Sequence, residues 1–289
     1  MLGGSAVHFA LAARFFTEAR IVGPVGDDFD EEYLELLSER GIDVSDVERV
    51  EGGKTFLWAG HYEADMNLAH TDDTQLGVFA DFDPKLSEAS RSADVLFLGN
   101  IQPDLQRRVR AQANGSRLTA LDSMNLWIET TRDSLVAAIS EVDCLLFNDS
   151  EIRMLTEEPN LARAARAVMD MGPRFVVAKR GEYGAVLFTP EGFFALPAFL
   201  LEDVRDPTGA GDSFAGGFLG YVDSQGPDAA TDHHALRRAM VYGATLASFN
   251  VEEFGTERVR RLTRDEVDER FEEFRQMTTL DSTSAQNIS

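Results

Sequence analysis

The sequence predicts an α/β fold in which helices flank a mostly parallel central sheet. Short apolar runs rich in β-forming residues alternate along the chain with segments whose apolar residues recur at helical spacing. The chain is also long enough for one large domain, because 289 residues of 44% hydrophobic composition can bury a sizeable core. We therefore expect a single domain over residues 1–277. Residues 278–289 are polar and aperiodic, which predicts a disordered tail.

Strands and helices are expected to alternate in the first half of the chain. Residues 20–25 form an apolar run typical of a buried strand, and residues 31–40 carry the helical pattern that follows it. Residues 95–98 and 118–121 are two more short apolar runs, with a helix expected near residues 103–112 between them. Parallel strands are joined by crossovers of this kind.

The same alternation continues up to a predicted hairpin. A helix at residues 129–140 leads into a strand at 142–147, and a helix at 161–171 precedes a strand at 175–178. The last two strands of the pattern, residues 185–188 and 193–196, flank a short turn sequence, TPEG, and are expected to pair as a hairpin.

Three helices are expected after the hairpin. They cover residues 210–222, residues 235–248 and residues 264–277. The last of them has Thr263 as its N-cap and Glu266 three residues later, the spacing of a capping box.

One segment interrupts the alternation. Residues 55–62 and 67–79 have an extended pattern with polar residues mixed in, and no helix is expected between them. Within an α/β chain, such an insert is often a small sheet that projects over the functional site. We interpret residues 50–80 as a β lid, and the alternative is an edge hairpin without a role.

The charge of the chain restricts its partners. Its 50 acidic and 27 basic residues give a net charge of −23, which repels phosphate backbones and anionic lipids. Neither nucleic acid nor a membrane is therefore expected as a partner. Only Lys54, Lys85 and Lys179 are lysine, and the other basic residues are arginine. Both a cytoplasm of high salt and a GC-rich genome would explain this bias.

The sequence is typical of a cytoplasmic protein. No run approaches the roughly 18 apolar residues that a membrane span needs, and the start lacks the basic and apolar regions of a secretory signal. The single cysteine, Cys144, lies in an apolar run, which predicts a buried, reduced thiol. A catalytic cysteine is the alternative, although nothing near it in the sequence would activate a thiolate.

The most informative motif is DPTGAGDSFAGGF at residues 206–218. Thr208 can cap a helix that opens with small residues, which would leave the N–H groups of Gly209, Ala210 and Gly211 accessible to an anion. Asp212 would repel a static phosphate, but it suits a base that deprotonates an attacking hydroxyl group. The motif therefore predicts phosphoryl transfer. The glycines at 216 and 217 predict close backbone packing behind the site.

This motif resembles the C-terminal motif of the PfkB/ribokinase family of carbohydrate and nucleoside kinases. The resemblance extends over nearly the whole chain and implies a ribokinase-like fold, ATP and Mg²⁺ as cofactors, and a small sugar or nucleoside as substrate. It implies that Asp212 is the catalytic base and that Gly209, Ala210 and Gly211 form the anion hole, with Thr208 beside the nucleotide. It also leaves room for a monovalent cation and for a homodimer formed through the lid.

Two shorter segments resemble the family's glycine and Mg²⁺ motifs. Gly3 and Gly4 are similar to the diglycine at which the family's lid hinges over the substrate. Asn148 and Glu151 follow a strand and resemble the N-x-x-E motif, in which Glu151 would organise water around Mg²⁺. By its own chemistry, Asn148 is more simply explained as a helix cap.

Five further residues resemble the nucleotide site. Lys179, Gly181 and Gly184 match a K-x-G-x-x-G turn that lies beside the nucleotide in the family, although such glycine spacing alone usually marks only a turn. Gly243 and Ala244 fall where the family forms the wall of its adenine pocket, and small residues in a helix also suit simple packing.

The sequence departs from the family at the substrate end. His8 stands where sugar kinases carry a substrate-binding asparagine, so we expect His8 to contact the substrate without fixing which sugar or nucleoside binds. Asp122 and Asn125 follow a strand and are expected either to touch the acceptor or to form a self-satisfied turn. The family also has a strand and an aspartate before the diglycine, so we expect the given chain to lack the first strand of a longer protein. A folded relative that binds its ligand without catalysis is the alternative to a kinase.

Overall fold

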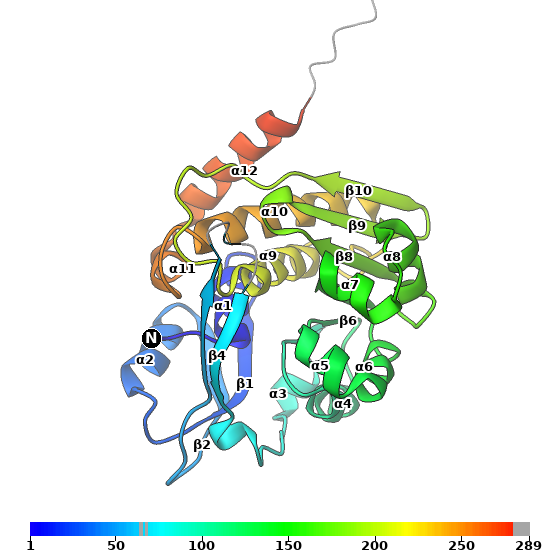
Figure 1. Cartoon of the computed structure of the whole chain (residues 1–289). Helices are drawn as coiled ribbons and strands as arrows, with labels where there is room; N and C mark the ends of the chain where they lie inside the picture. The colour runs from blue at the N-terminus through cyan, green and yellow to red at the C-terminus, as the bar shows by residue number, and fades with distance from the viewer. Residues whose placement is uncertain (64–65, 67–68, 280–289) are drawn as a thin grey trace, which may run out of the picture.

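The computed structural model describes residues 1–63, 66 and 69–279, which form an α/β fold with three sheets (Figure 1). The largest sheet has six strands in the order β10-β9-β8-β7-β6-β5. These strands are β5 (Val95–Leu98), β6 (Leu118–Leu121), β7 (Cys144–Asn148), β8 (Phe175–Lys179), β9 (Ala185–Thr189) and β10 (Gly192–Leu196). Strands β5 to β8 are parallel, and β9 and β10 each run antiparallel to the strand before. The predicted fold class and strands are confirmed.

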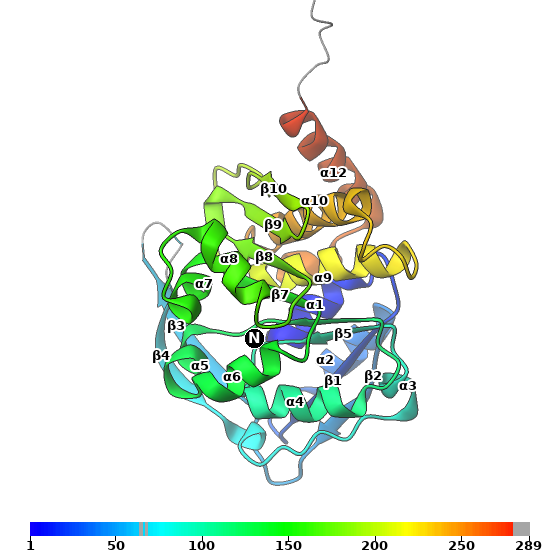
Figure 2. The same cartoon turned by 90° about the vertical axis from the view of Figure 1, so that its right-hand side faces the viewer.

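Helices cover both faces of this sheet, because its strands bury side chains on both sides. On β7, Cys144 and Leu146 belong to one apolar cluster, and Leu145 and Phe147 belong to the other. The first face packs against α9 (Ala210–Ser224), α10 (His233–Asn250) and α12 (Arg264–Thr278), and the second against α4 (Pro103–Gln112), α5 (Asn125–Thr130), α6 (Arg132–Ile139), α7 (Asp149–Thr156) and α8 (Leu161–Met169) (Figure 2). Burial on both faces explains the continuous apolar runs of the sequence.

A second, smaller unit contains a pair of parallel strands, β1 (Ala19–Val25) and β2 (Ile42–Arg49), with α2 (Glu31–Glu39) between them in sequence. Together with α1 (Ser5–Ala13) they enclose a separate apolar core. The sequence pattern does not predict β2, because only Ile42 among its residues is buried and acidic side chains interrupt the apolar ones.

Helix α1 lies directly against α9, which begins more than 190 positions later in the sequence. A Cβ atom added to Gly216 would lie 2.3 Å from the carbonyl oxygen of Phe9, and one added to Gly217 would lie 2.8 Å from that of Tyr242 on α10. The close packing predicted for these two glycines is therefore confirmed. At the end of α1, Arg14 donates to the carbonyl oxygen of Leu262 at 3.0 Å, so the two ends of the fold are joined.

The insert forms an antiparallel pair, β3 (Leu57–Tyr62) and β4 (Ala69–Gln75). A short 3₁₀ turn, η1 (Gly77–Phe79), replaces the last residues that were predicted to be extended. The expected extended segment begins at residues 67–68, which lie outside the described residues.

The other differences concern helices. The helix predicted at 129–140 is two helices, α5 and α6, because Thr131 between them leaves helical geometry at φ −140°. Helices α3 (Glu88–Arg91) and α11 (Glu257–Arg261) are too short to show a helical period in the sequence. The capping box of Thr263 and Glu266 is confirmed. Within the described part of the chain, no helix is both long and apolar enough to cross a membrane, and the predicted tail falls almost wholly outside it.

Candidate active site

The motif at residues 206–212 forms a loop that leads into α9. The carboxylate of Asp206 holds this loop from both sides, since one oxygen accepts from the N–H of Thr208 at 3.0 Å and the other from that of Gly255 at 2.8 Å. The N-cap of α9 is Gly209, which has a φ of 78°, and no side chain caps the helix. The prediction that Thr208 caps α9 is therefore wrong. Its hydroxyl group instead hydrogen-bonds to the Tyr62 hydroxyl of β3 at 3.1 Å.

The first turn of α9 presents backbone donors, but fewer than the motif suggests. The N–H of Ala210 donates to the carbonyl oxygen of Pro207 at 3.1 Å and closes a turn. Among the residues that the structure describes, the N–H groups of Gly209 and Gly211 make no hydrogen bond. They lie at the positive end of a 15-residue helix, which suits an anion.

Asp212 lies in the first turn of α9, half-buried beside these donors. Burial and, to a lesser extent, the nearby carboxylate of Asp122 raise the pKa of its carboxyl group to about 7, against the opposing effects of Lys179 and a hydrogen bond from Ser5. Ser5 opens α1 directly after Gly3 and Gly4, so the diglycine does lie at this site. A carboxyl group that titrates near neutral pH is suited to accept a proton from an alcohol.

Three further polar residues come from the carboxyl ends of adjacent parallel strands. Asp122 follows β6, Asn148 ends β7 and Lys179 ends β8. The ammonium group of Lys179 lies 2.5 Å from the Asp122 carboxylate. In open α/β sheets, ligands bind at this edge of the strands.

Asn148 and Glu151 form a capping box at the start of α7. Each side chain accepts a hydrogen bond of 2.8 Å from the backbone N–H of the other. The capping explanation for Asn148 is therefore confirmed. Burial and the nearby Asp122 raise the pKa of Glu151 to about 8. A cation bound nearby would therefore stabilise the ionised form of this carboxyl group.

Gly181 and Gly184 form the turn between β8 and β9. Both have positive φ, at 54° and 86°. The 3₁₀ turn η2 (Gly181–Tyr183) occupies this connection, and backbone hydrogen bonds close it. The turn directly follows Lys179, as the sequence predicts.

Four residues expected at the substrate or nucleotide have other surroundings. His8 is only 1% exposed, and its Nδ1 hydrogen-bonds to the Asn250 side chain at 2.8 Å, so it lies beneath the loop. Gly243 and Ala244 are buried in the contact between α10 and α9, where a Cβ on Gly243 would lie 2.9 Å from the carbonyl oxygen of Phe214. Asn125 begins α5 on the surface, and its side chain accepts from the N–H of Leu126.

The sequence pattern did not reveal Asn250, which organises the loop from below. Its side chain accepts hydrogen bonds from Ser213 and pairs with His8, and its amide donates to the carbonyl oxygen of Thr208 at 2.8 Å. It ends α10, about 40 positions beyond the motif, in a segment without any turn or glycine signal.

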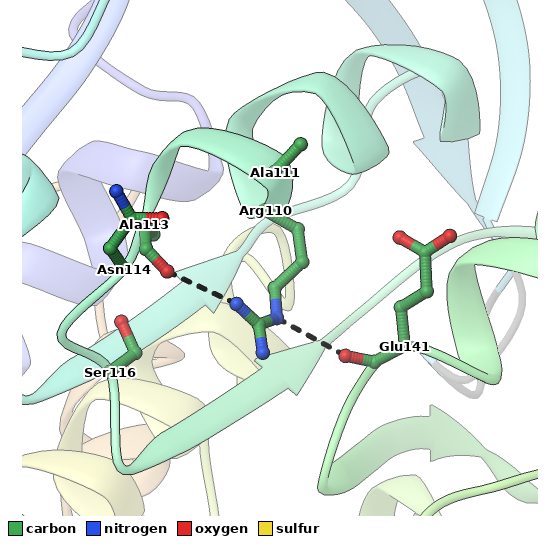
Figure 3. Close-up of a pocket in the computed structure, with 6 residues that line it drawn as sticks. All are labelled: Arg110, Ala111, Ala113, Asn114, Ser116 and Glu141. Carbon is green, nitrogen blue, oxygen red and sulfur yellow. Dashed lines mark hydrogen bonds between the residues drawn. The ribbon is translucent and has the colours of Figure 1, made fainter.

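A concavity lies at the opposite edge of the sheet, near the starts of β6 and β7 (Figure 3). The Arg110 side chain in it donates to the carbonyl oxygens of Ala113 and Glu141, which secures the end of α4. Its guanidinium therefore has a structural explanation, and the candidate active site remains the edge at which β6 to β8 end.

The chain is similar to known proteins over most of its length. The family model described as pfkB family carbohydrate kinase matches residues 2–261. The chain is 31% identical over 229 residues to a cytidine kinase of Thermococcus kodakarensis, covering 76% of this chain and 80% of that protein. It is 30% identical over 220 residues to an ATP-dependent ribose-1-phosphate kinase of Halopiger xanaduensis, covering 75% and 72%. The crystal structure of a Methanocaldococcus jannaschii nucleoside kinase, titled an archaeal member of the ribokinase family, matches with a TM-score of 0.75 at 23% identity, covering 94% of this chain and 86% of that one.

Proposed function

Because the chain belongs to the pfkB family of carbohydrate kinases, we propose that Asp212 is the base with which it phosphorylates a hydroxyl group of a sugar or nucleoside. The phosphoryl group comes from ATP, as in the ATP-dependent ribose-1-phosphate kinase to which the chain is similar. The observation that supports this role for Asp212 is its place in the first turn of α9, beside the backbone donors of Gly209 and Gly211 and near Lys179. The family match favours a kinase over a relative that only binds its ligand.

In the proposed reaction, the acceptor hydroxyl gives its proton to the Asp212 carboxylate as its oxygen bonds to the γ-phosphorus. The bond from that phosphorus to the bridging oxygen breaks, and ADP leaves with the electron pair. The N–H groups of Gly209 and Gly211 would hold the oxygens of the moving group, with the dipole of α9 in support. Gly3 and Gly4 would border the acceptor from the start of α1.

The residues of the site could hold Mg²⁺ only together with the phosphates of a bound nucleotide. The described residues contain no cluster of three or more metal-ligating side chains. Mg²⁺ commonly uses one or two carboxylates together with waters and substrate phosphates, and Glu151 keeps one carboxylate oxygen outside its capping box. Glu151 would therefore hold the ion through water, and the ion would supply positive charge against the phosphates. Lys179, Gly181 and Gly184 would border the nucleotide.

The test of Asp212 is the variant Asp212→Asn, assayed by ADP release with ATP and Mg²⁺. We expect turnover to fall by about 10²–10⁴, the usual contribution of a positioned base. Nucleotide affinity should hold, because the anion donors are backbone groups. Asp223→Asn is the matched control, since Asp223 lies on the same helix but pairs with Arg117 far from the loop. Near-normal turnover in Asp212→Asn would exclude the role.

The acceptor is identified with a substrate panel on the unaltered protein. The panel contains cytidine, other nucleosides, ribose, ribose-1-phosphate and fructose, with ADP release as the signal. Two finer features are part of the same proposal: activation by a monovalent cation, tested with K⁺ against tetramethylammonium, and a cytoplasmic homodimer joined through the β3–β4 hairpin, tested by light scattering. Equal rates in both salts or a monomer in solution would remove the respective feature.

A further inference from the structure

The ammonium group of Lys179 lies between a carboxylate and the proposed anion hole. On one side its Nζ is 2.5 Å from Oδ2 of Asp122. On the other side, a Cβ atom added to Gly211 would lie only 2.9 Å from the same Nζ, so the ammonium group borders the first turn of α9. Both side chains of the pair are largely buried, at 17% and 7% exposed.

Asp122 is fixed by the surrounding chain. Its backbone N–H donates to Leu98 at 3.0 Å, and its carbonyl oxygen accepts from Gln106 at 2.9 Å. Its second carboxylate oxygen accepts from the N–H of Ser123 at 2.9 Å. Both carboxylate oxygens of Asp122 are thus already hydrogen-bonded within the protein, which favours the self-satisfied turn over direct substrate contact.

An ammonium group has three N–H donors, and Asp122 needs only one of them. The pair thus anchors Lys179 and leaves it able to donate to an anion at the start of α9. The alternative is a purely structural ion pair, but such pairs are weak evidence for stability once desolvation is counted. The surrounding charge also supports a role beyond a structural ion pair, because Asp122, Glu151 and Asp212 all lie near this one lysine.

We propose that Lys179 is a catalytic residue that donates to the transferring phosphoryl group, and that Asp122 is the positioning residue that holds it there. The inference rests on the proposed function. As the oxygen–phosphorus bond to the acceptor forms and the bond to ADP breaks, negative charge spreads over the phosphoryl oxygens. Lys179 stays protonated throughout and offsets that charge, while Asp212 alone exchanges the proton. Without Lys179, the N–H groups of Gly209 and Gly211 would face that charge beside the carboxylates of Asp122, Glu151 and Asp212.

A lysine at this position suits a site that has room only for a small donor group. The chain has only three lysines among 27 basic residues, and Lys54 and Lys85 are exposed. Elsewhere its buried or half-buried ion pairs use arginine, as at Arg117 and Arg258. A compact ammonium group fits between Asp122 and Gly211, where a planar guanidinium would be wider.

The first experiment is Lys179→Met, which keeps the length of the side chain and removes its charge. We expect kcat per folded molecule to fall by about 10²–10³, the usual loss for one donor to a developing charge, with the KM for the acceptor changed less than about threefold. Arg117→Met is the matched control, because it breaks another largely buried ion pair away from the site and should change stability without changing kcat. A kcat within threefold of the unaltered protein would overturn the inference, and so would a loss fully explained by unfolded protein.

The second experiment restores the charge. In Lys179→Cys, alkylation with bromoethylamine forms a sulfur–carbon bond, releases bromide and places an ammonium group at nearly the original distance. The only native cysteine, Cys144, is fully buried, and burial raises the pKa of its thiol, so it should not react in the folded protein. One added group by mass spectrometry with at least tenfold recovery of kcat supports the inference. One added group without recovery contradicts it.

The third experiment tests Asp122 by the pH dependence of kcat. The groups that face Asp212 are Asp122 from the end of β6, Lys179 from the end of β8 and the Ser5 hydroxyl from α1. Asp122→Asn removes a negative charge, so the pKa of Asp212 should fall and the acid limb of the profile should move to lower pH, together with a loss of kcat. An unmoved limb would contradict the positioning role. If the unaltered protein phosphorylates nothing in the panel, the proposed function itself fails; if it is active and Lys179→Met is equally active, only this inference fails.

Discussion

Replacing Gly209 by alanine should damage the loop at residues 206–212 more than any other single methyl group added to it. The residue has a φ of 78°, which costs a non-glycine residue about 1–2 kcal/mol. A Cβ atom there would also lie 2.4 Å from three atoms of the His8 ring. That ring cannot move away easily, because it is 1% exposed and hydrogen-bonded to Asn250. Overpacking of this kind costs about 1–3 kcal/mol, so we expect a total loss of about 2–5 kcal/mol.

The control is Gly226→Ala, because Gly226 has a similar φ of 89° and no atom within 4 Å of an added Cβ. Urea denaturation of both variants separates the two costs: Gly226→Ala measures the backbone cost, and the additional loss in Gly209→Ala measures the clash with His8. Turnover should fall at least tenfold in Gly209→Ala and stay unchanged in Gly226→Ala.

A double variant tests the cause of the clash. Adding His8→Ala to Gly209→Ala should remove the overlap, so the two changes together should cost less than the sum of their separate effects by about 1–3 kcal/mol. Equal stability of Gly209→Ala and Gly226→Ala, or strictly additive effects in the double variant, would refute the reasoning.

Three further outcomes are expected. Tyr62→Phe removes the hydrogen bond from the hairpin to Thr208, worth about 0.5–1.5 kcal/mol, so kcat/KM should fall by about 2–10-fold; an unchanged value would leave the hairpin without a role in turnover. Gly243→Ala brings a Cβ to 2.9 Å from the Phe214 carbonyl oxygen, so Tm should fall while the KM for ATP stays constant; a raised KM at constant Tm would support the adenine-pocket expectation instead. Because screening shortens from about 10 Å at 0.1 M salt to about 3 Å at 1 M, the net charge of −23 predicts a Tm that rises with KCl to molar concentrations; a flat or falling curve would leave GC bias as the reason for the arginines.

The sequence was most informative where local chemistry determines local structure. The apolar runs predicted every strand of the main sheet. Strands β6 to β9 are buried along nearly their whole length and form continuous apolar runs, whereas the more exposed β10 was recognised as the second strand of a hairpin. The loop at residues 206–212 was recognisable because glycines and a carboxylate at a helix start are rarely combined without an anion. The close approach of Gly216 and Gly217 to other helices also followed from their position inside a helix.

The errors arose where distant segments determine the outcome. Thr208 would be a good N-cap in isolation, but its hydroxyl group hydrogen-bonds to Tyr62, and its N–H donates to the Asp206 carboxylate. His8 was expected at the substrate because it stands where sugar kinases of the family carry an asparagine, yet its partner Asn250 is 242 positions away. No local pattern could reveal that pair. Strand β2 was missed for a different reason, because only one of its residues is buried.

The contacts of α1 with the end of the chain have a consequence for how the protein is made. His8 must meet Asn250, and Arg14 must meet Leu262, across 242 and 248 positions. At a synthesis rate of about 5–20 residues per second, α1 leaves the ribosome about 10–50 s before these partners do. For most of that interval Ala12 lacks the helices α9 and α10 with which it shares an apolar cluster. Contacts so distant in sequence also form slowly, because loop closure costs entropy before they contribute. The loop at residues 206–212 should therefore be among the last parts of the protein to acquire its final form.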